Sequence, residues 1–223
     1  YKDAVFADCD IDKLVLKIEI FGYFTLSSSL SNNIHIYCCD DTIIHKKAII
    51  KGNIKEINLN DTHFKDDIDF SNSKNIETEF SLTSIKFDKN VKIENSKISN
   101  IHFQDIVFYN NKQGSEFASI KINDCVFLNK FNFRENCKSI EILNTIFEKD
   151  ICLNLANFDD LKFNKNILVD EAHLKDCSFY ENSSFTNNVF KNNAYFNNST
   201  FHKYADFHEC EFEKTACFYG VSF

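Results

Sequence analysis

The amino-acid sequence predicts an all-β fold, a parallel β-helix (solenoid) with four sides to each coil. Three features of the 223-residue chain lead to this fold class. Large apolar residues recur every five or six positions, equivalent positions recur after 19 to 22 residues, and small residues lie two positions before many of the large ones. A short, strict period is typical of one structural unit stacked many times.

The clearest repeat lies near the C-terminal end of the chain. There, every residue of one series is Phe, and from Phe179 onward the steps alternate between six and five residues. We expect these rings to be the core anchors of the solenoid, because the intervening positions carry Asn, Asp, Lys, Glu and Tyr. The predicted anchors are Phe163, Phe179, Phe185, Phe190, Phe196, Phe201, Phe207, Phe212 and Phe218.

A longer period appears when four steps are grouped into one row. The row starts are Phe103, Ile122, Ile142, Phe163, Phe185 and Phe207, and earlier rows start at Leu59 and Leu82. Each row predicts one coil with four sides, so the sequence predicts about eight coils. The alternating steps predict one additional residue at every second corner.

Small residues support the inward assignment of the anchors. They lie two positions before an anchor at Ala156, Ala172, Cys177, Ala194, Ser199, Ala205, Cys210 and Ala216. Residues i and i−2 of an extended segment point the same way, so a large anchor beside a small neighbour can fill a narrow interior. In the middle rows this position holds Ile101, Ile120, Ile140 and Leu161, and we expect the most regular parallel ladder there.

Short motifs within the repeat resemble those of the pentapeptide-repeat family. That family repeats A-[DN]-[LF]-x-x, and Ala156-Asn157-Phe158 and Ala205-Asp206-Phe207 match this core. The alternation of five and six residues is similar to an eleven-residue variant of bacterial members. The resemblance implies a right-handed quadrilateral β-helix, which we assign to residues 36–223, with the clearest repeats at 142–223.

The first 35 residues do not follow the repeat. The segment 14–20 alternates imperfectly between apolar and polar residues and predicts a strand. The open first coil of a solenoid needs a cover over its apolar interior, so we expect residues 1–35 to form an irregular β N-terminal cap. At the other end, Phe223 falls on an anchor position, which predicts an uncapped C-terminal coil able to self-associate end to end.

Composition limits the classes of partner. The formal net charge is −8, from 25 basic and 33 acidic residues, which argues against direct binding of a nucleic-acid backbone. No apolar run is long enough to form a transmembrane segment. The nine Cys residues are odd in number and contain no C-x-x-C pair, so we interpret them as reduced thiols of a cytoplasmic protein.

Candidate sites are few. No sequence motif for catalysis, nucleotides or cofactors is present, and an interior filled with Phe leaves no room for a pocket. We therefore predict no enzyme, no catalytic residues and no cofactor. His202, His208 and Glu209 could approach one corner, but their spacing does not demand a metal site, so no metal is predicted. The register turns four tyrosines outward as candidate surface contacts: Tyr180, Tyr195, Tyr204 and Tyr219.

These features favour a non-catalytic scaffold, a protein-interaction module that presents flat, rigid faces. Two alternatives stay open at the level of the sequence. Some pentapeptide-repeat proteins are acidic DNA mimics that bind DNA gyrase or topoisomerase, but here the segment 174–223 holds six acids and four lysines, which is a balanced composition. The chain could also be a soluble domain of a larger, membrane-attached protein.

Overall fold

The computed structural model describes residues 2–7, 13–16, 19–28, 34–38, 42–72, 77–108 and 119–223. These residues form strands and turns without any helix, and every strand pairing among them is parallel. The predicted all-β, parallel solenoid is therefore confirmed. The chain divides into two compact units, Tyr1–Lys121 (unit 1) and Ile122–Phe223 (unit 2), which are described separately below.

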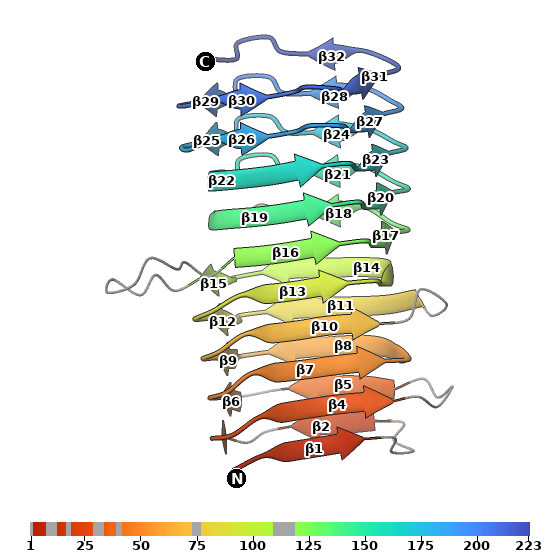
Figure 1. The fold of residues 1–223 in the computed structure, drawn as a ribbon, viewed down its shortest axis with the longest axis vertical. Helices are drawn as coiled ribbons and strands as arrows, with labels where there is room; N and C mark the ends of the chain where they lie inside the picture. Colours follow the sequence, from red (N-terminus) through yellow and green to blue (C-terminus); the bar gives the residue numbers. More distant parts are fainter. Residues whose placement is uncertain are drawn as a thin grey trace. The chain divides into compact units, whose positions relative to one another are not determined.

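Unit 1 consists of three parallel sheets, and Figure 1 shows the strands of each sheet stacked side by side. Sheet A contains β1 (Ala4–Ala7), β4 (Phe24–Ser28), β7 (Ala48–Gly52), β10 (Ile68–Asn72) and β13 (Val91–Glu94). Sheet B contains β2 (Lys13–Leu16), β5 (Ile34–Cys38), β8 (Ile54–Asn60), β11 (Glu77–Thr83) and β14 (Lys97–Gln104). Sheet C contains β3 (Glu19–Ile20), β6 (Thr42–Ile44), β9 (Thr62–Phe64), β12 (Lys86–Phe87) and β15 (Val107–Phe108). The next strand, β16 (Ser119–Asn123), crosses the division between the units.

Unit 1 has three sheets instead of the four predicted sides. A strand of sheet B spans two of these sides, because it contains two buried anchor positions. In β8, both Ile54 and Leu59 are fully buried although they lie five residues apart. The pairing of β11 with β14 shifts register by one residue after Thr78, as a β-bulge does, so the strand bends without a turn. Three predicted row starts form one column of sheet B, because Leu59 pairs with Leu82 and Leu82 pairs with Phe103. The next predicted row start, Ile122, lies on β16 of sheet A, so the prediction of one continuous column is wrong at this step.

The start of the chain differs from the expected cap. Strands β1 to β4 lie within residues 1–35, and β1 pairs with β4, β2 with β5 and β3 with β6, all in parallel. Leu16, Ile20 and Phe24 are buried like the anchors of later turns. No change in pairing therefore marks residue 35. These residues lie four positions apart instead of five or six, which concealed the repeat from the sequence.

Unit 2 has four faces. Face one contains β19 (Cys137–Leu143), β22 (Asn157–Asn164), β25 (Ser178–Phe179) and β29 (Thr200–Phe201). Face two contains β26 (Ser183–Ser184), β30 (Ala205–Asp206) and the second halves of β19 and β22. Face three contains β17 (Val126–Phe127), β20 (Ile146–Phe147), β23 (Ile167–Leu168), β27 (Val189–Phe190) and β31 (Glu211–Phe212). Face four contains β18 (Phe131–Asn132), β21 (Ile151–Cys152), β24 (Ala172–His173), β28 (Ala194–Tyr195) and β32 (Ala216–Cys217).

The predicted Phe anchors fill the interior of unit 2. Rings of successive turns stack nearly parallel, for example Phe179 on Phe201 with centroids 4.6 Å apart and Phe190 on Phe212 at 4.7 Å. Six of the nine anchors are at most 2% exposed: Phe163, Phe179, Phe185, Phe190, Phe196 and Phe201. Phe207 and Phe212 are half-buried and Phe218 is 36% exposed, since each belongs to the last turns of this chain and stacks on a ring from one side only.

Corners of two kinds alternate along unit 2, as the five- and six-residue steps predict. A five-residue step that turns a corner places its second residue after the anchor at positive φ, as in Asn187 (φ 58°) and Asn198 (φ 57°). The step from Phe158 to Phe163 has none, because it lies within the continuous strand β22. The six-residue steps contain no such residue in the described chain. Asn and Asp tolerate this conformation better than most residues do, which explains their abundance at these corners. The positions are Asp124, Asn144, Leu155, Lys165, Asp176, Asn187, Asn198, Glu209 and Gly220.

A buried column of polar side chains joins the turns behind face three. Asn166 and Asn188 are fully buried, and the Asn166 backbone N–H donates to Asn188 Oδ1 at 2.9 Å. The Asn188 amide in turn donates to the carbonyls of Phe163 and Phe185. Thr145 begins the same column, since its N–H donates to Asn166 Oδ1 at 3.0 Å. This arrangement satisfies corner groups that would otherwise be buried without partners.

Candidate binding surfaces

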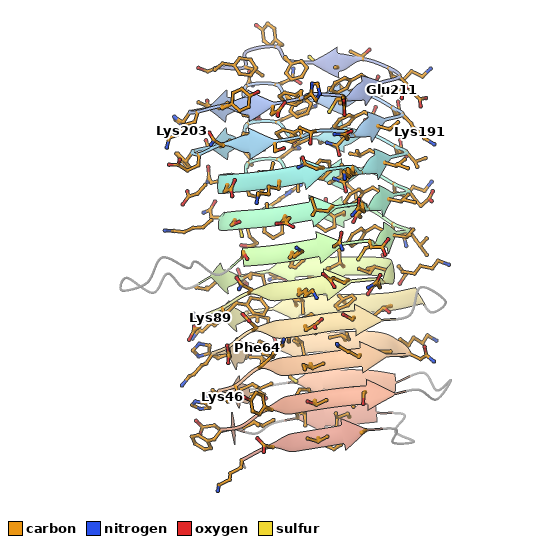
Figure 2. All side chains as sticks on the ribbon, in the orientation of Figure 1. Lys46, Phe64, Lys89, Lys191, Lys203 and Glu211 are labelled. Carbon is orange, nitrogen blue, oxygen red and sulfur yellow. The ribbon has the colours of Figure 1, made fainter. Side chains whose placement is uncertain are left out.

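The outward side chains of unit 2 define what the protein offers to other molecules, and Figure 2 shows Lys191, Lys203 and Glu211 directed away from the stack. The three residues considered at one corner do not converge: His202 stacks on Tyr180, whereas His208 pairs with Glu209 at 3.2 Å. Within the described ranges, no group of three His, Cys, Asp or Glu side chains could hold a metal ion. The same part of the chain contains no helix that could span a membrane.

Cysteines that line the interior of unit 2 have a structural role, because they fill space between larger side chains. Burial raises the pKa of the Cys177 thiol to about 12, and its Sγ donates to the Leu153 carbonyl at 3.0 Å. Burial also raises the pKa of Cys210. A thiol that stays protonated is a poor nucleophile, so Cys177 and Cys210 are unreactive compared with an exposed thiol near neutral pH.

The four predicted outward tyrosines fall into two groups. Tyr180, Tyr204 and Tyr219 are 46%, 67% and 79% exposed, as their register predicts. Tyr195 is instead half-buried, because its ring stacks on His173 at 5.3 Å and its hydroxyl donates to Glu171 at 3.4 Å. The ring of Tyr195 is therefore engaged within the chain.

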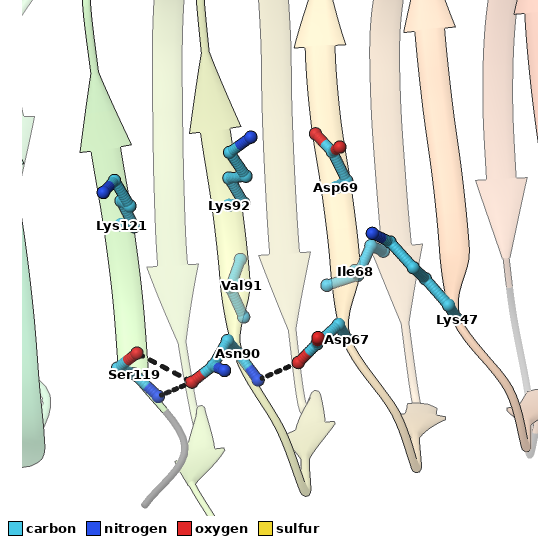
Figure 3. A pocket seen from close by; sticks show the side chains of 9 residues that line it. All are labelled: Lys47, Asp67, Ile68, Asp69, Asn90, Val91, Lys92, Ser119 and Lys121. Atoms are coloured by element: carbon cyan, nitrogen blue, oxygen red, sulfur yellow. Dashed lines mark hydrogen bonds between the residues drawn. The ribbon is translucent and has the colours of Figure 1, made fainter.

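One hollow lies on the outer face of sheet A in unit 1 (Figure 3). Its lining residues are Lys47, Asp67, Ile68, Asp69, Asn90, Val91, Lys92, Ser119 and Lys121. Its lower edge is a hydrogen-bonded row, in which the Asn90 N–H donates to Asp67 Oδ1 at 3.0 Å. In the same row, the Ser119 hydroxyl donates to Asn90 Oδ1 at 2.8 Å.

The charges around this hollow are largely compensated within the chain. Lys92 forms an ion pair with Glu94 at 2.7 Å, and this hydrogen bond is the main reason why the pKa of Lys92 is raised. Asp69 accepts a hydrogen bond from Ser71 at 2.8 Å and lies 3.7 Å from the Lys51 amine. A ligand would have to displace these contacts, which makes this hollow a weak candidate.

A second hollow lies on face one of unit 2, beside Tyr180. It is lined by Asn136, Cys137, Lys138, Asn157, Asp159 and Tyr180. The Asn157 amide donates to Asn136 Oδ1 at 2.7 Å, whereas the Lys138 amine is 4.0 Å from Asp159 Oδ2. The carboxylate is thus held much more loosely than Glu94 in unit 1.

Register determines which side of the Tyr180 ring borders this hollow. Phe158 pairs with Phe179 and Phe179 pairs with Phe201, so Asp159, Tyr180 and His202 follow one another along the stack. His202 covers one face of the Tyr180 ring at a centroid distance of 4.9 Å and an interplanar angle of 10°. The other lining residues precede Tyr180 in the stack, so the hollow lies along the opposite face of the ring.

Together, these features define a class of protein, the parallel β-solenoid repeat proteins. The interior is filled by apolar side chains, so the polar and charged groups that could contact another molecule lie on the outer faces. A family model described as pentapeptide repeats, with nine copies, matches residues 168–211. The resemblance found in the sequence is confirmed, and this segment is a run of pentapeptide repeats. No curated protein and no solved structure matches the chain.

The sequence predicted that Tyr180 of face one points outward, but it did not predict the hollow beside this residue. Tyr180 was recognisable as outward because it directly follows an anchor. The hollow was not, because it depends on how far Lys138 and Asp159 reach across neighbouring turns. One signal was available: Asp159, Tyr180 and His202 each follow an anchor at the same position of successive coils.

Proposed function

We propose that this protein is a non-catalytic scaffold that binds a partner protein through face one of unit 2. The contact surface consists of Tyr180, His202 and the hollow beside Tyr180 on face one, together with Tyr204 at the corner between β29 of face one and β30 of face two, and is called the tyrosine face below. One observation carries the proposal: an exposed tyrosine ring is fixed by stacking beside an open, polar hollow. Tyrosines held in place lose little conformational entropy on binding and are frequent energetic centres of interfaces.

The backbone beneath the tyrosine face supports this role. β22, β25 and β29 are hydrogen-bonded in register, and the anchors Phe158, Phe179 and Phe201 stack directly beneath the surface. A surface mounted on such a ladder changes shape little when it binds. The free thiols of unit 2 that the structure describes are consistent with the cytoplasmic location that we propose.

A photo-crosslinking experiment tests the proposal. Benzoylphenylalanine would replace Tyr204 in the full chain, in cells of the source organism, and Lys191 on face three would be replaced as the matched exposed control. We expect one discrete covalent adduct with a partner protein from position 204 and none from position 191. Equal adducts from both positions, or none from position 204, would refute binding through the tyrosine face.

The DNA-mimic alternative has less support. On faces one and two, positive charges interrupt the acidic residues, since Lys138 lies 4.0 Å from Asp159 and Lys203 pairs with Glu181 of the neighbouring turn. A mimic of the DNA backbone would need a continuous negative stripe. We expect the protein to leave gyrase supercoiling unchanged at excess concentration. Self-association through the C-terminal turn stays a prediction, which sedimentation would test.

A further inference from the structure

We infer that the hollow beside Tyr180 is a binding site for an arginine side chain of the partner protein. The guanidinium group would lie against the uncovered face of the Tyr180 ring and form a salt bridge with the Asp159 carboxylate. The inference rests on the proposed function, since it specifies the chemical group that the tyrosine face recognises.

The ring of Tyr180 supplies the first half of the site. One of its faces is occupied by the imidazole of His202, and the other borders the hollow. The face of an aromatic ring carries partial negative charge and attracts a cation placed over it. The same interaction already occurs in this chain on face four, where the Lys175 amine lies 4.4 Å from the centre of the Tyr195 ring.

The Asp159 carboxylate supplies the second half. Its side chain is 42% exposed, and it lies one turn before Tyr180 in the stack. The Lys138 amine stands at 4.0 Å, the outer limit of an ion pair, so Lys138 only weakly compensates this carboxylate. Asp159 can therefore accept an additional cation without breaking a close internal contact.

The shape of the site favours arginine over lysine. Ring and carboxylate follow each other along one column, so a planar group that stacks on the ring can point its N–H donors at the carboxylate. Guanidinium does both, and its fork matches a carboxylate with two parallel hydrogen bonds, whereas an ammonium group is a compact point charge. The amides of Asn136 and Asn157 line the same hollow and offer further hydrogen-bonding groups.

Charge complementarity points in the same direction. The chain carries a net charge of −8, so a basic segment of a partner is attracted to it from a distance. Together with the local geometry, this commits the site to a cationic group on a protein rather than to an anion or an apolar side chain.

The first experiment compares three tripeptide amides as probes of the full chain: acetyl-Gly-Arg-Gly, its lysine counterpart and its citrulline counterpart. Binding is followed by NMR chemical shifts at low ionic strength. We expect the arginine peptide to shift the resonances of Asp159 and Tyr180 and to saturate them at millimolar concentration. The lysine peptide should bind about threefold and the neutral citrulline peptide about tenfold more weakly.

Variants separate the contributions of the site. Asp159→Asn should weaken binding of the arginine peptide about fivefold and Tyr180→Leu about threefold. Lys138→Met removes the internal competitor and should strengthen binding about twofold. Tyr219→Leu, at an exposed tyrosine outside the hollow, is the matched control and should have no effect. All four positions are at the surface, so the amide spectra should confirm unchanged folding.

The inference would be overturned if the citrulline peptide bound as tightly as the arginine peptide, or if Asp159→Asn left the affinity for the arginine peptide unchanged. Methyl glucoside serves as a probe for a sugar site. Shifts at Asp159 and Tyr180 that this sugar causes and the arginine peptide does not would also overturn the inference. The crosslinking experiment tests the proposed function independently of the arginine site. An adduct from position 204 without binding of the arginine peptide would leave the proposed function intact and refute only the arginine site.

Discussion

Units 1 and 2 stack their turns with different interiors. Unit 1 relies on long strands, such as β8 with seven residues and β14 with eight, and its core is rich in Ile, Leu and Phe. In unit 2, every strand after β22 has two residues, and the interior is a set of Phe columns with a polar ladder beside them. Long hydrogen-bonded strands therefore characterise unit 1, whereas stacked aromatic side chains characterise unit 2.

The residue two positions before the anchor contributes to this difference. In β10, both Ile68 and Phe70 are large and point inward, which favours an extended strand, since bulky and β-branched residues pack well on a pleated surface. On face four, Ala194 precedes Phe196, and the small side chain leaves room for rings to stack edge to face across the interior. A large residue at this inward position is not sufficient for a long strand, since β18 and β21 have two residues each although Phe131 and Ile151 are buried there.

The largest expected effect comes from removing one stacked ring. Phe196 is fully buried, stacks on Phe218 at 4.8 Å and meets Phe185 and Phe207 edge to face. Phe196→Ala should lower the free energy of unfolding by about 3–5 kcal/mol through the cavity that it leaves. Urea unfolding followed by circular dichroism measures the loss.

Two further substitutions sharpen this comparison of the units. Tyr219→Ala, at an exposed ring, should change the unfolding free energy by less than about 0.5 kcal/mol. Phe196→Leu should cost about 1 kcal/mol more than Phe70→Leu, since Phe70 of unit 1 meets one ring, Phe80, among the residues that the structure describes. Equal costs would show that ring stacking adds nothing to the stability of unit 2.

The next effect concerns the polar ladder. Asn188→Ala deprives the buried Asn166 N–H and the carbonyls of Phe163 and Phe185 of their hydrogen-bond partner. Because the polar groups left behind are buried, the unfolding free energy should fall by about 3 kcal/mol. Asn192→Ala is the control, since its amide bonds Asp170 at a half-buried corner, and the loss there should be about 0.5 kcal/mol. Similar losses in both variants would contradict the importance of the ladder.

The two units also differ in how far the sequence could predict them. Phe179 and Phe201 were predictable as one column because residue type and spacing are both constant there. Leu16, Ile20 and Phe24 were not, because they differ in type and lie four residues apart instead of five or six, and a register shift also occurs after Ile34. A bulge adds a residue without a turn signal, so an interrupted period in the sequence does not mean an interrupted stack.

The polar ladder and the hollow show a second limit of the sequence. Asn188 lies two positions before the anchor Phe190, where the period turns a residue inward, whereas Asn192 lies two positions after it. The hydrogen bonds that join Asn188 to Asn166 and Phe163 of the preceding turn do not follow from the sequence. The hollow beside Tyr180 depends on the reach of side chains from three successive turns. Inward or outward direction follows from the period alone, whereas depth and contact between turns require coordinates.

A pH-dependent prediction follows from the interior of unit 2. Burial raises the pKa of Cys177 to about 12, from a reference value of 9.0. The folded chain therefore keeps this proton where the unfolded chain loses it, so the resulting stability is fully present below pH 9 and is lost as the pH rises towards 12. Between pH 8 and 10, the difference in unfolding free energy between wild type and Cys177→Ala should shrink by about 1.4 kcal/mol. A constant difference would mean that Cys177 does not titrate on unfolding.

The smallest effect concerns a corner that breaks the rule followed by its neighbours. Leu155 is 64% exposed and adopts φ 65°, a conformation that Asn187 and Asn198 occupy at equivalent corners. Because a bulky aliphatic residue is strained there, Leu155→Asn should raise the free energy of unfolding by about 0.5–1 kcal/mol. The reverse change, Asn198→Leu, should lower it by at least as much, since it also removes the hydrogen bond from the Asn198 amide to Asp176. If both variants melt at the wild-type temperature, corner strain does not limit the stability of unit 2, and the Asn and Asp residues at these corners would need another explanation.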